Sequence, residues 1–125
     1  EAAHVELDAT AKLSDGKVKV TVGGKNVTEM TYPATLQLRV VVVESGLTVE
    51  IGAGELKGKS VTYDNAARRW AAPVKYEGEQ GKRKTFDVEV ALEKEWKVEN
   101  LAVVLFVQDS ETLKVWQAAR VKITK

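Results

Sequence analysis

Residues 5–22 read VELDATAKLSDGKVKVTV, and this stretch decides the fold class. Apolar side chains occupy every second position on both sides of a central Ser-Asp-Gly-Lys, which is the period of strands with one buried and one solvated face. Asp-Gly between two such runs is a strong signal for a tight turn. The stretch therefore predicts a hairpin at the start of the chain.

Similar strand patterns continue to the end of the chain. Residues 35–44 alternate at first and become apolar on both sides over residues 40–43, which predicts a strand covered on both faces. Gly23 and Gly24 are expected to end the second strand of the hairpin. Further strands are predicted over residues 47–51, 86–92, 101–107 and 115–123.

A helical turn is predicted over residues 65–71, with Asn65 as its cap and Pro73 as its end. Taken together, these patterns predict an all-β fold, an antiparallel immunoglobulin-like β-sandwich of seven or eight strands with one short helical turn. Residues 1–125 are expected to form a single domain, because their length suits one core.

Composition limits the partners of this domain. The chain is 44% hydrophobic and 30% charged, which is typical of a globular protein. Its net charge is +1, from 19 Lys plus Arg and 18 Asp plus Glu, so no strong field attracts nucleic acid or anionic lipid. No apolar run approaches the roughly 20 residues of a membrane-spanning helix. We expect no nucleic acid binding, no membrane insertion and, given the charged strands, a monomer.

Catalytic groups are scarce in this sequence. It has no cysteine and one histidine, His4, which is expected to be solvated on the polar face of its strand. Residues 58–60, Gly-Lys-Ser, resemble the end of a phosphate-binding loop but lack its earlier glycine and its following helix. The basic residues 82–84, with Arg68 and Arg69, are an alternative anion contact or a solvated charge run. We therefore expect no enzyme activity, no cofactor and no metal site.

Two longer segments carry a resemblance to known proteins. Residues 40–69 contain VVVVESGL and GELKGKSVTYDNAARR, and residues 101–109 read LAVVLFVQD. These segments are similar to the β-rich C-terminal portion of secreted, thioredoxin-like bacterial proteins of unknown function, including outer-membrane-associated relatives. The resemblance implies an extracytoplasmic accessory domain, periplasmic or secreted, without an established activity. Leu56 and Tyr63 stand where that pattern has asparagine and histidine, so its polar site residues are absent here.

The departures from that pattern leave two origins open. Regular Lys and Glu alternation, the missing polar residues and the lack of cysteine also fit an engineered version of such a domain. In either case the sequence favours a non-enzymatic structural or interaction domain with a protein partner.

A small-molecule-binding protein is the alternative function. Ala66 and Ala67 stand where the pattern has two valines, which removes about four methyl groups beside Trp70. Either Trp70 fills this space itself, or a pocket for a small apolar ligand remains. The predicted lining of such a pocket is Tyr63, Trp70, Trp116, Ala66 and Ala67.

Overall fold

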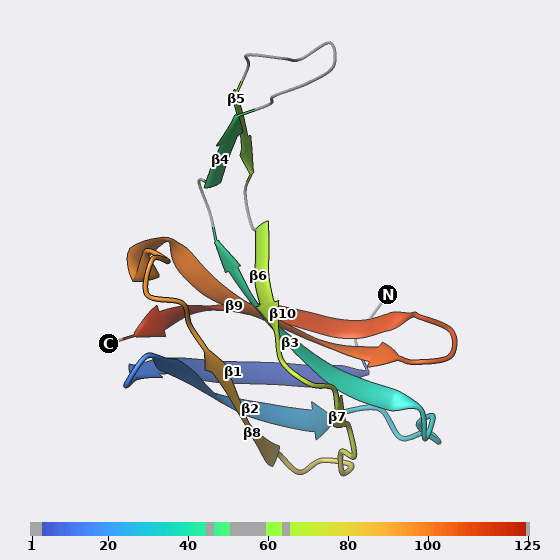
Figure 1. The fold of residues 1–125 in the computed structure, drawn as a ribbon. Helices are drawn as coiled ribbons and strands as arrows, with labels where there is room; N and C mark the ends of the chain where they lie inside the picture. Colours follow the sequence, from blue (N-terminus) through green and yellow to red (C-terminus); the bar gives the residue numbers. More distant parts are fainter. Residues whose placement is uncertain (1–3, 45–46, 51–59, 64–65, 125) are drawn as a thin grey trace.

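The computed structural model describes residues 4–44, 47–50, 60–63 and 66–124. In these ranges, β4 (Leu47–Glu50) and β5 (Ser60–Tyr63) form a two-stranded ribbon that projects from the rest of the molecule (Figure 1). The one helical element in the described ranges is the 3-10 turn η1 (Val98–Asn100). The all-β class is thus confirmed. Eight strands form the main sheet: β1 (Val5–Ser14), β2 (Lys17–Asn26), β3 (Leu36–Glu44), β6 (Ala66–Trp70), β7 (Val74–Lys75), β8 (Lys84–Ala91), β9 (Leu101–Asp109) and β10 (Val115–Thr124).

The main sheet is mixed and curled. Its strands follow the order β6-β3-β9-β10-β1-β2-β8, and β7 pairs with the same strand, β3, as β6 does. Strand β1 runs parallel to β10, with Ala11 opposite Ile123, and the other described pairs are antiparallel. The expectation of a purely antiparallel fold is therefore wrong, and an immunoglobulin-like sandwich is not confirmed. Alternation indicates which face of a strand is buried, but it does not specify the neighbouring strand or its direction.

The first hairpin forms as predicted. Strands β1 and β2 pair in register from Val5 opposite Asn26 to Ser14 opposite Lys17. Asp15 and Gly16 both have positive φ, 47° and 73°, as a turn of type I′ requires. This local signal was sufficient because the turn and its flanking strands are adjacent in sequence.

Strand β2 is longer than predicted. Gly23 and Gly24 do not end it, and the ladder continues to Asn26. A Cβ atom on Gly24 would lie 2.8 Å from Cε1 of Tyr76, and one on Gly23 would overlap the Arg83 side chain. The two glycines therefore let other side chains approach the strand, a use of glycine within strands that breaks no pairing.

The predicted helical turn at residues 65–71 is a strand instead. Residues 66–70 form β6, which pairs with β3 through Trp70 opposite Val41 and Ala67 opposite Val43. A bulge between Val42 and Val43 shifts this register. Pairing with a buried, valine-rich strand outweighs the helix propensity of a short alanine-containing segment. The predicted cap, Asn65, lies outside the described residues.

The core lies between the two halves of the curled sheet. The side chains of β2 and β9 that face it are 0–1% exposed: Val18, Val20, Val22, Val103, Leu105 and Val107. The other face of β3 is covered as well, since Val41 and Val43 are each 4% exposed and cluster with Ala102. The prediction of a strand buried on both sides is confirmed.

The sheet stays open between its two edges. Within the described ranges no backbone ladder joins β8 to β6 or β7. Arg69 of β6 bridges one end of this opening, donating from Nη1 to the carbonyl oxygen of Ala91 at 3.0 Å and from Nη2 to Glu93 at 2.6 Å. At the other end, Tyr76 packs on Phe86 of β8 with ring centroids 5.5 Å apart. Side chains thus connect the two edges at both ends.

Candidate functional site

An aromatic and arginine cluster lies on the outer face of β6, β3 and β9. Trp70 is 49% exposed and meets Phe106 edge-on, with ring centroids 6.0 Å apart. The guanidinium carbon of Arg39 lies 5.0 Å from the centroid of the Trp70 ring. Because Trp70 is opposite Val41, whose side chain belongs to the cluster outside the core, this surface faces away from the core. We call the surface formed by Trp70, Arg39, Phe106 and Val104 the Trp70 face.

Arg39 has an unusual hydrogen-bonding state. Its Nε is the one buried side-chain nitrogen or oxygen in the described part of the chain that has no partner. A guanidinium is a donor-only group, and burying a donor without an acceptor is unfavourable. Stacking on Trp70 offsets part of this cost through the attraction between a cation and an aromatic ring. The guanidinium of Arg39 therefore adds a positive charge to the Trp70 face, while its Nε is buried without an acceptor.

The charged residues on the outward side of β3, β9 and β10 are cations, although Glu99 of η1 lines one surface hollow together with Arg120 and Lys122. Strand β10 contributes Arg120 and Lys122, whose partners in the β9 ladder belong to the same outward-facing set as Phe106. Alternation along β3, β9 and β10 places these two cations on the same side of the sheet as Arg39. Among the outward-facing residues of these three strands, all described, there is no carboxylate. The Trp70 face is apolar and cationic.

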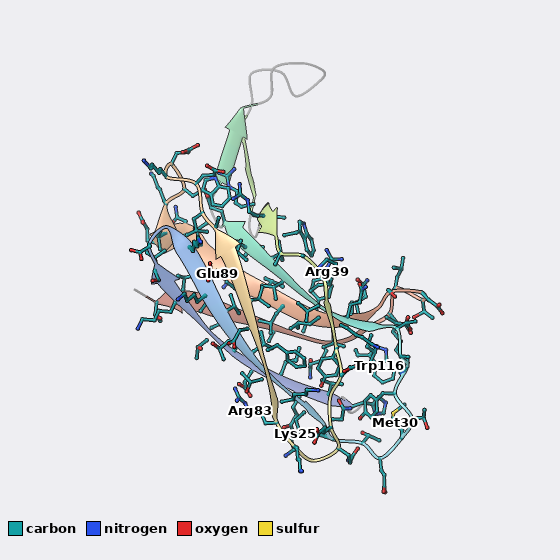
Figure 2. All side chains as sticks on the ribbon, turned by 60° about the horizontal axis from the view of Figure 1, so that its bottom comes forward. Lys25, Met30, Arg39, Arg83, Glu89 and Trp116 are labelled. Carbon is teal, nitrogen blue, oxygen red and sulfur yellow. The ribbon has the colours of Figure 1, made fainter. Side chains whose placement is uncertain are left out.

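The outer face of β1, β2 and β8 is different, because it carries charges of both signs and two ion pairs. Lys17 contacts Glu89 at 3.2 Å, and Arg83 forms a two-nitrogen contact with Asp8. The hydrogen bond from Arg83 holds the pKa of Asp8 below its usual range. Figure 2 shows Arg83 and Glu89 on this side of the molecule, away from Arg39.

A second aromatic cluster lies at one end of the sheet. His4 and Tyr32 both contact Trp116, at centroid distances of 5.6 and 5.8 Å. His4 Nδ1 lies 2.9 Å from Oγ1 of Thr28, and the Tyr32 hydroxyl donates to the His4 carbonyl oxygen at 2.8 Å. The prediction of a simply solvated His4 is therefore wrong. The His4 ring is partly buried because the loop after β2 passes over it.

The predicted pocket residues fall into different places. Trp70 is on the outer face, whereas Trp116 packs against the core beside Tyr32, and Figure 2 shows Trp116 well separated from Arg39. Ala67 is exposed opposite Val43. Tyr63 ends β5 and Ala66 begins β6, with side-chain surroundings outside the description. Ligand binding by this set stays a prediction, and the structure does not bring Trp70 and Trp116 together.

The basic residues of the predicted anion contact also separate. Arg68 contacts Glu44 at 3.1 Å, Arg69 contacts Glu93, and Arg83 contacts Asp8. Each arginine is therefore paired with a carboxylate. The Gly-Lys-Ser segment at residues 58–60 lies outside the described residues except for Ser60, which begins β5. In the described ranges, no group of three His, Asp or Glu side chains could hold a metal ion.

Sequence reasoning missed Arg39 and Phe106 as surface residues. A signal existed, because Arg39 is the one charged residue between Leu36 and Val43, and an arginine within an apolar strand needs a specific environment. Phe106 carried no such signal, since it stands in a run predicted to be buried throughout.

Fold and surface together define an all-β domain with a curled mixed sheet and an aromatic, cationic outer face. The chain belongs to the family described as "Protein of unknown function (DUF1223)", whose model matches residues 1–108. No helix in the described ranges is sufficiently long and apolar to cross a membrane. A search among curated proteins found no match.

Two solved structures share the fold. One is a domain of the outer membrane lipoprotein Omp28 from Porphyromonas gingivalis, with 22% identity, a TM-score of 0.64, and coverage of 99% of this chain and 91% of that one. The other is HBP35 of Porphyromonas gingivalis, with 14% identity, a TM-score of 0.75, and coverage of 97% of this chain and 41% of that one. The chain thus spans less than half the length of HBP35.

These similarities agree with the predicted relationship to outer-membrane-associated domains of unknown function. The thioredoxin-like part of that resemblance stays a prediction. An engineered origin finds no support among these comparisons.

Proposed function

We propose that this chain is an extracytoplasmic, non-enzymatic interaction module whose Trp70 face binds an acidic protein segment with exposed apolar side chains. The observation that carries the proposal is the pair formed by half-exposed Trp70 and Arg39, whose buried Nε has no partner. Exposed aromatic residues and arginine are the side chains enriched at the centres of protein interfaces. A carboxylate from the partner would be attracted to the positive charge of the Arg39 guanidinium.

Charge favours an acidic partner. Arg39 and Lys122 share one side of the sheet, and complementary potentials both guide association and exclude basic partners. The apolar part of the segment would cover Trp70 and Phe106, which already pack edge-on and present a rigid surface. Rigid aromatic side chains lose little conformational entropy on binding.

Two observations support the remaining parts of the proposal. The extracytoplasmic location draws on the fold shared with a domain of an outer membrane lipoprotein. The non-enzymatic role draws on the sequence, which has no cysteine and one histidine, and on the contact of that histidine's Nδ1 with Thr28. This contact joins the His4 ring to the loop after β2.

Tryptophan fluorescence tests the binding face directly. The probe is a synthetic peptide that alternates glutamate with phenylalanine, and its control carries lysine at each glutamate. We expect a saturable blue shift with the acidic peptide that weakens as salt rises, because exposed charge pairs are screened. Trp70→Phe should abolish the shift, and Trp116→Phe, the matched control, should retain it. Equal binding of both peptides, or a shift that survives Trp70→Phe, would contradict the proposal.

A further inference from the structure

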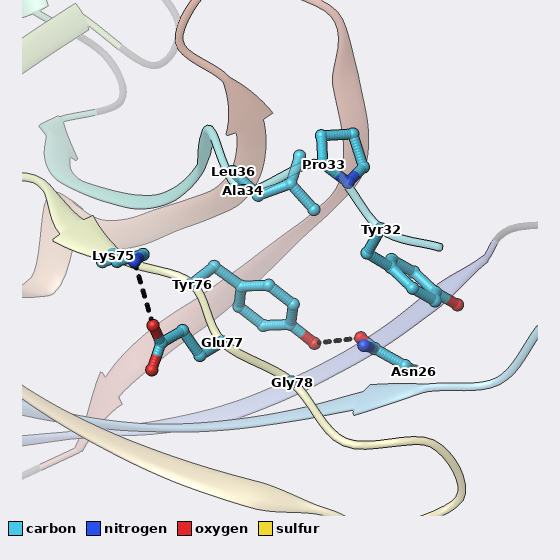
Figure 3. Close-up of a pocket in the computed structure, with 9 residues that line it drawn as sticks. All are labelled: Asn26, Tyr32, Pro33, Ala34, Leu36, Lys75, Tyr76, Glu77 and Gly78. Atoms are coloured by element: carbon cyan, nitrogen blue, oxygen red, sulfur yellow. Dashed lines mark hydrogen bonds and ion pairs between the residues drawn. The ribbon is translucent and has the colours of Figure 1, made fainter. Parts of the chain in front are cut away.

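A cavity separate from the Trp70 face lies between the loop after β2 and the segment after β7. Its volume is about 220 Å³, and Figure 3 shows its lining. The Tyr32 and Pro33 rings and the buried side chain of Leu36 form one wall, and Tyr76 forms the opposite wall. The cavity therefore combines aromatic walls with a polar part of similar extent, and small-molecule sites pair such surfaces.

One buried amide supplies the polar part of this cavity. Asn26 is 5% exposed, and its Oδ1 accepts a hydrogen bond from the Tyr76 hydroxyl at 2.9 Å. Its Nδ2 donates to none of the residues that the structure describes, although Asn26 lines the cavity. Because Arg39 Nε is the one fully buried side-chain nitrogen or oxygen without a partner in the described ranges, Asn26 Nδ2 keeps some accessible surface, and a donor of this kind is available to a ligand.

The geometry around this amide is built closely. A Cβ atom on Gly78 would lie 2.6 Å from the Tyr76 hydroxyl, and one on Gly24 would lie 2.8 Å from the same ring. Backbone hydrogen bonds from Asn26 to Glu79 and from Gly81 to Asn26 fix the segment around the amide, at 3.2 and 2.9 Å. The donor is therefore held in one position by the fold.

The remaining polar groups of the lining are already satisfied. The Tyr32 hydroxyl points away from the cavity in Figure 3, where it contacts His4 and the backbone of Thr28. Lys75 and Glu77 at the rim pair with each other at 3.1 Å. A charged ligand would have to break this pair or go without a counter-charge, so the cavity fits a neutral ligand.

We infer that this cavity is a binding site for a compact, neutral, apolar group that carries a carbonyl oxygen, which accepts a hydrogen bond from Asn26 Nδ2. A five-membered ring beside a carbonyl has this chemistry. It occurs both in free cyclic ketones and amides and in a proline residue of a peptide. The site differs from the Trp70 face in location, ligand charge and donor, so either one can fail without the other.

The experiment follows the side-chain NH₂ signals of Asn26 in proton–nitrogen correlation spectra of the whole chain. The probes are cyclopentanone, blocked N-acetylproline methylamide, and cyclopentane as the control without an acceptor. We expect saturable shifts at Asn26 and at the Gly78 amide with the two carbonyl probes and not with cyclopentane. Stronger binding of the proline compound would indicate a peptide ligand, and stronger binding of the ketone a free molecule.

Two variants separate recognition from packing. Asn26→Asp keeps the oxygen that accepts from Tyr76 and removes the donor, so carbonyl binding, followed at the Gly78 amide, should weaken by about tenfold or more. Asn100→Asp, the same change near η1, should leave binding unchanged. Gly78→Ala adds a methyl group against the Tyr76 hydroxyl and should also abolish binding. Equal shifts from cyclopentane and cyclopentanone, or unchanged binding in a folded Asn26→Asp variant, would overturn the inference.

Discussion

The two outer faces of the curled sheet differ in how their charges are used. On β1, β2 and β8, Asp8 pairs with Arg83 and Glu89 pairs with Lys17. On β3, β6 and β9, Arg39 stacks on an exposed Trp70 and keeps a buried nitrogen unpaired. One sheet with one shared core therefore has an outer face with paired charges of opposite sign and another on which the Arg39 Nε donor has no acceptor. A buried polar group without a partner, such as Arg39 Nε, therefore marks the face where a binding role is expected.

Both faces share one core, so we expect them to unfold as one cooperative unit. A core substitution tests this, and of the variants discussed it should change the free energy of unfolding the most. Leu105 of β9 is fully buried among residues from both halves. Leu105→Ala should destabilise the fold by about 2–5 kcal/mol, because it removes buried methyl groups and leaves a cavity. Urea unfolding followed by both circular dichroism and tryptophan fluorescence provides the measurement.

The matched control for this substitution is Leu113→Ala, since Leu113 is 66% exposed in the turn before β10. It should change the free energy of unfolding by no more than about 0.5 kcal/mol. Both probes should report one transition in each variant. Two separate transitions would mean that the halves of the sheet fold independently, and the comparison would then concern two units.

Tyr76 connects the two halves, and alkaline pH should weaken that connection. Its hydroxyl, on the segment after β7, donates to Asn26 on β2, and burial raises the pKa of Tyr76 to about 12 from an ordinary 10.0. A folded-state pKa that is raised gives stability that is full below the ordinary pKa and is lost as pH rises through the folded value. The loss between pH 10.0 and about 12 is about 2 kcal/mol.

The free energy of unfolding at pH about 9 and at pH about 12 measures this loss. Tyr76→Phe should reduce the difference between the two values, although the variant is less stable at both because Asn26 loses its partner. If the variant shows the same alkaline loss as the unsubstituted chain, other groups cause it, and the connection through Tyr76 is weaker than the contact indicates.

Local features of the fold were predictable, and features that join distant segments were not. Asp15 and Gly16 are adjacent to both strands of their hairpin, so the turn could be predicted from a short stretch. The β1–β10 pair joins Ala11 to Ile123, and no periodicity carries information across that separation. The glycines of β2 were misinterpreted for the same reason, because the ring that needs Gly24 belongs to Tyr76, far along the chain.

The candidate sites follow the same division. Trp70 could be singled out from the sequence, yet its environment could not, because the preceding segment pairs as a strand with β3 instead of forming a helical turn. Asn26 and Tyr76 are 50 positions apart and meet only through the fold. Arg39 was visible as a lone charge in an apolar strand, and only the structure shows that its Nε is unpaired.

A substitution at Arg39 sharpens the contrast between the faces with a moderate effect. Arg39→Met keeps much of the apolar stem and removes the unpaired donor, so stability should stay the same or rise by up to about 1 kcal/mol. Binding of the acidic peptide should nevertheless fall by about tenfold or more, because its carboxylate loses the guanidinium. Thermal unfolding and the fluorescence titration measure the two quantities on one sample. Loss of stability together with unchanged peptide binding would show that Arg39 is structural.

The smallest expected effect concerns the paired face and acid. Arg83 lies across Gly23, where a Cβ atom would overlap its guanidinium, and this position sets its contact with Asp8. The hydrogen bond from Arg83 lowers the pKa of Asp8 below 3.8, so its stabilisation is present above that value and is lost as pH falls through the folded pKa. Solvent screens this exposed pair, so the contribution is small and should decrease further with salt. Asp8→Asn should therefore lower the unfolding temperature slightly at neutral pH and flatten its decline in acid, whereas Asp15→Asn in the first turn should leave that decline unchanged. If the acid decline is identical in Asp8→Asn and in the unsubstituted chain, the contact between Asp8 and Arg83 does not stabilise this face. The two outer faces would then differ less than their contacts indicate.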